Sequence, residues 1–230
     1  MASVSEILAK LNLNRRDLSN VSLVQLETIF KDLTVKEIST LCTVNKRFNT
    51  LCENESFWRN KVSDDYGIHK KYGKTWRETA INMDKYDMIN LDDVWINGKT
   101  YMEMLDWALQ DGTDIIIDSQ TEYLCPYAND DVCNLDELSF LADDDAILQN
   151  FANEVLDRDY TEDELDVIFY IKNREMNIIY ATVDTYKNEN GYLPGNESDT
   201  ASQSYEVLRE MIDPILYVMQ FSSFPKEKLK

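Results

Sequence analysis

The amino-acid sequence predicts a mainly α-helical protein. Apolar side chains recur at helical spacing in segments that open with a capping-box pattern, as Ser22 does with Gln25 and Thr34 with Glu37. Six Gly and four Pro in 230 residues are too few for a protein rich in tight turns. The uneven distribution of charge along the chain predicts two units. Residues 1–80 hold 13 Lys and Arg and 10 Asp and Glu, whereas residues 81–230 hold 10 Lys and Arg and 33 Asp and Glu.

The N-terminal unit is expected to contain three short helices within residues 21–62. The first follows Ser22, the second follows Thr34 and runs to Leu51, and the third opens at Asn54 or Ser56 and carries a Phe-Trp pair. A unit of this size encloses little core alone, so we expect its remaining apolar surface to contact a partner. This prediction favours docking over catalysis.

Residues 81–230 are expected to form an acidic, mostly helical domain. The basic stretch before it, which begins at Gly67, is expected to be a linker or a small subdomain that ends near Asn82. An Asn-Gly turn predicts a small hairpin over Asp92–Tyr101, and three successive isoleucines at 115–117 predict one short buried strand. Helices are expected over 102–109, 134–141, 148–156, 161–183 and 205–219, with Pro214 kinking or splitting the last one.

Several functional classes conflict with this composition. The chain has no run of 18 apolar residues, and its N-terminus lacks the apolar core and cleavage site of a secretory signal. A soluble protein of the cytoplasm or nucleus is therefore expected, with no membrane partner. The net charge of −23 beyond residue 80 would repel phosphate backbones, so no nucleic-acid partner is expected.

The four cysteines are expected to be reduced free thiols, as is usual in the cytosol. Cys42 and Cys52 fall on apolar helix faces, where a thiol behaves as a small hydrophobic group. Cys125 and Cys133 are eight residues apart, and a bridge between them is the alternative. No Cys-x-x-Cys pair occurs, so a zinc site has little support.

The chain has few signals of an enzyme. His69 is the only histidine, and its pairing with Cys52 or Cys42 as base and nucleophile conflicts with the apolar setting of both cysteines. The acidic clusters at 130–131, 143–145 and 162–164 lack the alternating spacing of a calcium loop. We therefore expect no catalytic residue, metal or cofactor.

Residues 21–62 resemble an F-box, the adaptor-docking module of cullin-RING ubiquitin ligases. The match runs without a gap through Ile29-Phe30, Leu33, Lys36-Glu37-Ile38, Leu41, Val44, Lys46-Arg47-Phe48, Leu51 and Phe57-Trp58. The chain departs from the usual pattern at three places: Val21-Ser22 replaces Leu-Pro, Val24 takes an acidic position, and Asn45 replaces Cys. Its Asn- and Lys-rich character is similar to that of small F-box proteins encoded by giant viruses of amoebae.

The resemblance implies a non-catalytic subunit that docks a Skp-type adaptor and its cullin complex, while the acidic domain recruits a protein target. If the chain is viral, its location would be the host cytoplasm. Loss of Ile29, Leu33, Leu41, Val44 or Trp58 is expected to weaken docking most. The implied partner-binding residues are Val21, Leu26, Ile29, Phe30, Leu33, Ile38, Leu41, Val44, Phe48, Leu51, Phe57 and Trp58.

Two other functions remain open from sequence. One is a structural or host-interaction protein that kept the fold without the adaptor, which the missing Leu-Pro opening favours. The other is an enzyme of unrecognised type, which would require a pocket in residues 81–230 holding ionisable groups with shifted pKa values.

Overall fold

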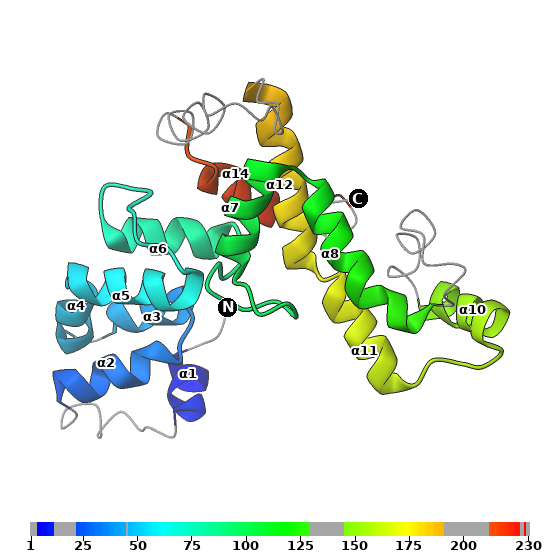
Figure 1. Ribbon diagram of the computed structural model, residues 1–230. Helices are drawn as coiled ribbons and strands as arrows, with labels where there is room; N and C mark the ends of the chain where they lie inside the picture. The colour runs from blue at the N-terminus through cyan, green and yellow to red at the C-terminus, as the bar shows by residue number, and fades with distance from the viewer. Residues whose placement is uncertain are drawn as a thin grey trace. The chain divides into compact units, whose positions relative to one another are not determined.

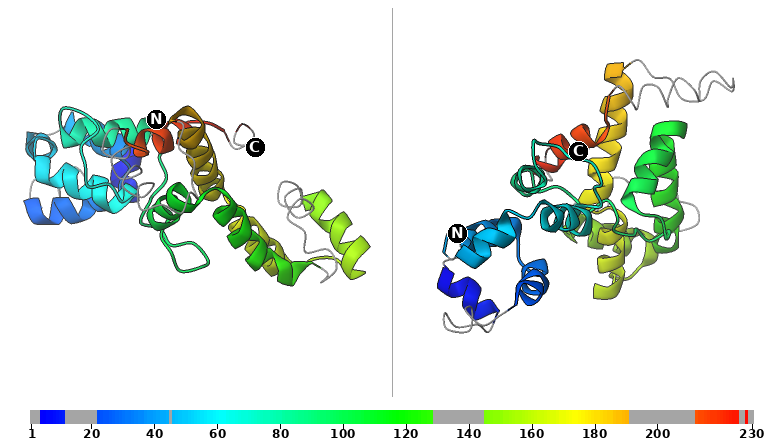
Figure 2. Two further views of the ribbon diagram at one scale, coloured as in Figure 1. Left: turned by 45° about the horizontal axis from the view of Figure 1, so that its top comes forward. Right: turned by 90° about the vertical axis from the view of Figure 1, so that its left-hand side faces the viewer.

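The protein is divided into two compact units, Met1–Asn90 and Leu91–Lys230. The structure, a computed structural model, describes residues 4–11, 22–44, 46–128, 145–190, 212–225 and 228 (Figures 1 and 2). The boundary lies ten residues after the change in charge at 80/81. The boundary lies later than the change in charge because helix α6 (Trp76–Lys85) begins within the expected linker. This helix packs against α5 (Glu55–Tyr66) and so belongs to the first unit.

The N-terminal unit is built from short helices that form a single core. Before α5 and α6 come α1 (Val4–Lys10), α2 (Leu23–Lys31), α3 (Val35–Cys42) and α4 (Lys46–Cys52), coloured blue to cyan in Figure 1. The prediction of a single helix between Thr34 and Leu51 is therefore wrong, because α3 and α4 occupy this segment. The N–H groups of Thr43 and Val44 bond to carbonyls three residues back, and this tight turn ends α3.

The predicted starts of α2 and α3 are confirmed. Ser22 and Gln25 form a reciprocal capping box on α2, and Thr34 and Glu37 form one on α3. In each box the Gln25 or Glu37 side chain accepts the N–H of the cap residue at 2.9 Å. These bonds satisfy backbone donors that the first helical turn leaves without partners, so the sequence locally determines where both helices begin.

Aromatic rings fill the centre of this unit. Phe30 lies 5.5 Å from Phe48 and 6.1 Å from Phe57, measured between ring centroids, and Phe57 lies 5.2 Å from Trp58. These four rings come from three helices, α2, α4 and α5, so the core joins helices that are distant in sequence. Burying such side chains is the main source of stability for a unit this small.

The C-terminal unit is also helical, with α12 as its longest described helix. Its elements are α7 (Tyr101–Asp111), α8 (Asp114–Leu124), a 3-10 turn η2 (Cys125–Tyr127), α10 (Asp145–Leu156), α11 (Glu162–Ile171), α12 (Arg174–Asn190) and α14 (Ile215–Ser222). Helix α12 packs against α7 and α14, while α8 packs against α7 and α11 (Figure 1). The mainly α fold class is thus confirmed.

Of the two β elements predicted for this unit, the hairpin is reduced to a single bridge and the strand is replaced by a helix. The Asp92–Tyr101 segment makes one antiparallel bridge between Val94 and Thr100, around a turn in which Gly98 has φ of 80°. The strand expected at 115–117 is wrong, because these isoleucines lie in α8, where Ile116 is fully buried. A run of three apolar residues suits a buried strand and a buried helix equally well.

The long helix expected over 161–183 is two helices. Lys172 caps α11, and the Asn173 side-chain oxygen then accepts the N–H of Met176 at 3.0 Å, which starts α12. Pro214 precedes α14, in agreement with the expected interruption there. The helix expected over 134–141 and the part of the last one before residue 212 lie outside the described residues.

No helix in the described part of the chain is long and apolar enough to cross a membrane.

The start of α11 gives a testable pH dependence. The Arg158 guanidinium makes two hydrogen bonds to the Glu164 carboxylate, at 2.7 and 2.8 Å, and Glu164 also completes a capping box with Thr161. Together these bonds lower the pKa of Glu164 to about 2. The carboxyl is ionised in the folded state well below the pH at which it protonates in the unfolded chain, about 4.3.

We expect this carboxyl to contribute stability above about pH 4.3 and to lose that contribution as the pH falls towards about 2. A carboxyl-carbon NMR titration of the full chain measures it directly. Arg158→Met should move the Glu164 midpoint up towards the ordinary range. An unchanged midpoint in that variant would rule out the guanidinium as the main cause.

Candidate docking surface

Most residues implied by the F-box resemblance form the core of the N-terminal unit. Trp58, for example, has no exposed surface, and its ring contacts Phe57 within the core. Such side chains hold the helices together and are not available on the surface of this unit. The buried members of the set are Leu26, Phe30, Leu33, Ile38, Leu41, Phe48, Leu51, Phe57 and Trp58.

The apolar side chains that reach the surface are fewer. Val24 is 71% exposed and Val44 is 41% exposed, while Ile29 is half-buried. Val24 was not among the implied partner-binding residues. It lies off the stripe formed by Leu26, Phe30 and Leu33, and an apolar residue outside the buried stripe is the sequence signal that could have identified it. Val21 lies outside the described residues.

A pocket of about 200 Å³ opens between α2 and α5 on this unit. Glu27 and Lys31 line it from α2, on the helix face that also carries Val24. Ser56, Asn60 and Asp64 line it from α5 at four-residue spacing, as do the buried side chains of Phe57 and Lys61. The pocket is large enough for one side chain, and its lining combines the Phe57 ring with side chains of both charges.

Lys61 fixes the position of the two helices that line this pocket. Its side chain is 5% exposed, and Nζ donates to the carbonyl oxygen of Lys31 at 2.8 Å and to the Asp65 carboxylate at 2.9 Å. Burial raises the pKa of Asp65, against the opposing hydrogen bond and charge of Lys61. A buried cation at the end of α2 also suits the negative end of the helix dipole, so Lys61 ties α2 to α5.

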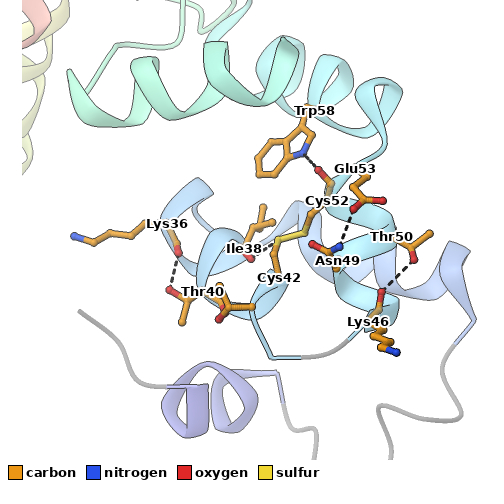
Figure 3. The surroundings of a disulfide bond; sticks show 11 residues. Lys36, Ile38, Thr40, Cys42, Lys46, Asn49, Thr50, Cys52, Glu53 and Trp58 are labelled. Carbon is orange, nitrogen blue, oxygen red and sulfur yellow. Dashed lines mark hydrogen bonds between the residues drawn. A yellow bond between two sulfur atoms is a disulfide. The ribbon is translucent and has the colours of Figure 1, made fainter. Parts of the chain in front are cut away.

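A disulfide joins Cys42 at the end of α3 to Cys52 at the end of α4 (Figure 3). The tight turn between the helices brings the two Cα atoms to 6.1 Å, within the range that a disulfide spans. Cys125 is disulfide-bonded as well. The expectation of free thiols is therefore wrong for these three cysteines, and Cys133 lies outside the described residues.

The disulfide and Trp58 belong to one buried network. The indole N–H of Trp58 donates to the carbonyl oxygen of Cys52 at 2.8 Å, as Figure 3 shows. Both cysteine side chains are also buried. The disulfide thus links α3 to α4, and the hydrogen bond links α4 to α5. The sequence pattern predicted neither bond.

The sequence offered one nucleophile–base pair in this unit, His69 with Cys42 or Cys52. The disulfide leaves neither Cys42 nor Cys52 as a thiol that could act with His69, whose Nδ1 lies 3.3 Å from the Ser63 hydroxyl on the surface. Within the described ranges, no group of three or more His, Cys, Asp or Glu residues could hold a metal ion. The acidic run at 162–164 forms the first turn of α11, where negative charge is favoured.

Comparison with known proteins gave no relative: neither the protein-family models, nor the curated proteins, nor the solved structures contain a match to this chain.

Proposed function

We propose that the N-terminal unit docks a Skp-type adaptor of a cullin-RING ubiquitin ligase and that the acidic C-terminal unit recruits a protein target. The chain would then be a non-catalytic substrate-recognition subunit. The observation that carries the proposal is the gapless F-box-like order of residues from Ile29 to Trp58, with most of its apolar positions gathered into one helical core. Location in the cytoplasm or nucleus is part of the same proposal.

Docking would use the residues that this core leaves outside. Val24 and Val44 expose apolar surface that a partner could bury, and Ile29 adds a half-buried edge. The pocket between α2 and α5 could accept one anchoring side chain from the adaptor. A few side chains buried in such pockets commonly contribute most of the binding energy of an interface. The Lys31–Asp64 pair at the rim, 3.5 Å apart and exposed, would contribute little by itself.

The proposal is tested by measuring binding of a purified Skp-type adaptor to the full chain. Val24→Asp/Val44→Asp is expected to weaken binding by about tenfold or more, because burying one valine contributes about 1.5 kcal/mol and a buried carboxylate costs more. Both positions are exposed, so the helical circular dichroism spectrum should not change.

Val94→Asp is the matched control, because Val94 is 53% exposed in the C-terminal unit and the substitution is the same. It should bind the adaptor as the unsubstituted chain does. Equal binding by the double variant and the control would overturn the assignment of the surface. No binding by the unsubstituted chain would overturn the ligase function itself.

A second candidate is a host-interaction or structural protein with the same fold but without the adaptor. The Val21-Ser22 opening in place of Leu-Pro favours it, because the usual opening contacts the adaptor in familiar F-boxes. Affinity purification of the full chain distinguishes the two: recovery of a cullin with its adaptor supports the ligase function, and stable recovery of other proteins without them supports the second candidate.

A further inference from the structure

The segment between α5 and α6 is basic in a chain whose net charge is −20. Residues 67–77 contain Lys70, Lys71, Lys74 and Arg77 and no Asp or Glu. Arg59, exposed on α5, adds a fifth cation, since its guanidinium lies 6.0 Å from the centre of the Trp76 ring. We call these five cations the basic face.

Aromatic rings hold several of these cations in place. Besides Arg59 above Trp76, the Lys70 ammonium lies 5.9 Å from the centre of the Tyr72 ring, and Arg77 lies 6.0 Å from the centre of Trp58. A cation over a ring face is attracted by the π electrons and loses part of its conformational freedom. These side chains are therefore partly ordered before any ligand binds.

The carboxylates beside the basic face bind the backbone. Glu55 accepts the N–H of Trp76 at 2.9 Å, and Glu78 accepts the N–H of Lys74 at 2.6 Å, so both stabilise the start of α6. Lys71 and Lys74 are exposed and have no carboxylate partner among the described residues. Arg77 is half-buried over Trp58, so four exposed cations (Arg59, Lys70, Lys71 and Lys74) against these two carboxylates leave the surface positive.

We propose that the basic face binds an acidic segment of a partner protein. Arg59 and Lys70 lie beside the half-buried rings of Trp76 and Tyr72, and these rings can cover apolar side chains between the partner's carboxylates. A protein segment fits better than a nucleic acid, because a long polyanion would also meet the strongly acidic remainder of this chain. Most of the face lies beyond residue 62, so this proposal does not depend on adaptor docking.

The test is a fluorescence anisotropy titration of the full chain against a short labelled peptide of alternating Glu and Gly. We expect saturable binding at low ionic strength that weakens as salt is added. Lys71→Glu/Lys74→Glu should raise the dissociation constant by about fivefold or more, since two favourable charge contacts become repulsive. Lys71→Gln/Lys74→Gln should give a smaller increase.

Lys36→Glu/Lys46→Glu is the matched control, because these lysines are exposed in the same unit and the change in net charge is identical. It should bind the peptide nearly as the unsubstituted chain does. Equal weakening in both charge-reversed variants, or no binding by the unsubstituted chain, would overturn the proposal. Tighter binding of a single-stranded DNA of the same length would overturn the choice of a protein partner.

Discussion

Replacing Trp58 by Ala is expected to lower the free energy of unfolding of the N-terminal unit by about 3–5 kcal/mol. The indole has no exposed surface and lies 5.2 Å from the Phe57 ring, so its loss leaves a cavity that small helices cannot fill without repacking. The substitution also removes the indole N–H that donates to the Cys52 carbonyl oxygen at 2.8 Å. Trp58→Phe should cost less, because it keeps most of the ring volume.

Hydrogen exchange of the full chain, followed by mass spectrometry, measures this effect within each unit. Peptides from α3, α4 and α5 should lose protection in Trp58→Ala, whereas those from α12 should not. Trp107→Ala is the matched control, because Trp107 is 36% exposed in the other unit and its removal should cost far less. Equal losses of protection in both variants would contradict the central role of Trp58.

This expectation changes how docking must be tested. Substitutions at buried positions such as Leu33 and Trp58 would unfold the unit and abolish adaptor binding whether or not these residues contact the adaptor. Substitutions at exposed positions, such as Val24 and Val44, separate contact from folding. Of the residues expected to matter most for docking, the buried ones, Leu33, Leu41 and Trp58, are therefore the poorest choice for testing it.

Opening the Cys42–Cys52 disulfide is expected to lower the free energy of unfolding of the same unit by about 2.5–3 kcal/mol. The bridge joins residues ten apart, and a loop of that length restricts the unfolded chain by about this amount. Reduction should therefore decrease protection from exchange in α3 and α4, which the bridge connects. The measurement is hydrogen exchange of the full chain with and without dithiothreitol.

Cys42→Ala/Cys52→Ala provides the control, since a reductant cannot open a bridge that is already absent. Its α3 and α4 peptides should exchange at the faster rate with or without dithiothreitol. The control also separates this bridge from the one that contains Cys125, which the reductant opens as well. Unchanged protection on reduction of the unsubstituted chain would contradict a stabilising role for the bridge.

The redox state bears directly on the proposed ligase function. A cullin complex would meet this chain in the cytoplasm or nucleus, where thiols are normally kept reduced. Adaptor binding should therefore be measured with the bridge closed and with it open. Binding by the open form would mean that the remaining core, centred on Phe30 and Trp58, suffices to present the docking surface.

The sequence predicted those features that depend on neighbouring residues. The capping boxes at Ser22, Thr34 and Thr161 could be predicted because each depends on two residues within one helical turn. The hydroxyl of the cap residue and the side chain three residues later accept each other's backbone N–H groups. The mainly α fold class followed from helical spacing. The division of 161–183 at Lys172 was missed because the apolar spacing continues across the break.

What the sequence determined by itself is thus the helical character, many of the helix starts and the apolar stripe of each helix. Only the tertiary structure decided what covers each stripe. Periodicity marks an apolar face, but packing between helices distant in sequence determines whether that face meets its own core or a partner. The same reason explains why Phe30 and Trp58 are buried together, why Val24 remains outside, and why Cys42 meets Cys52.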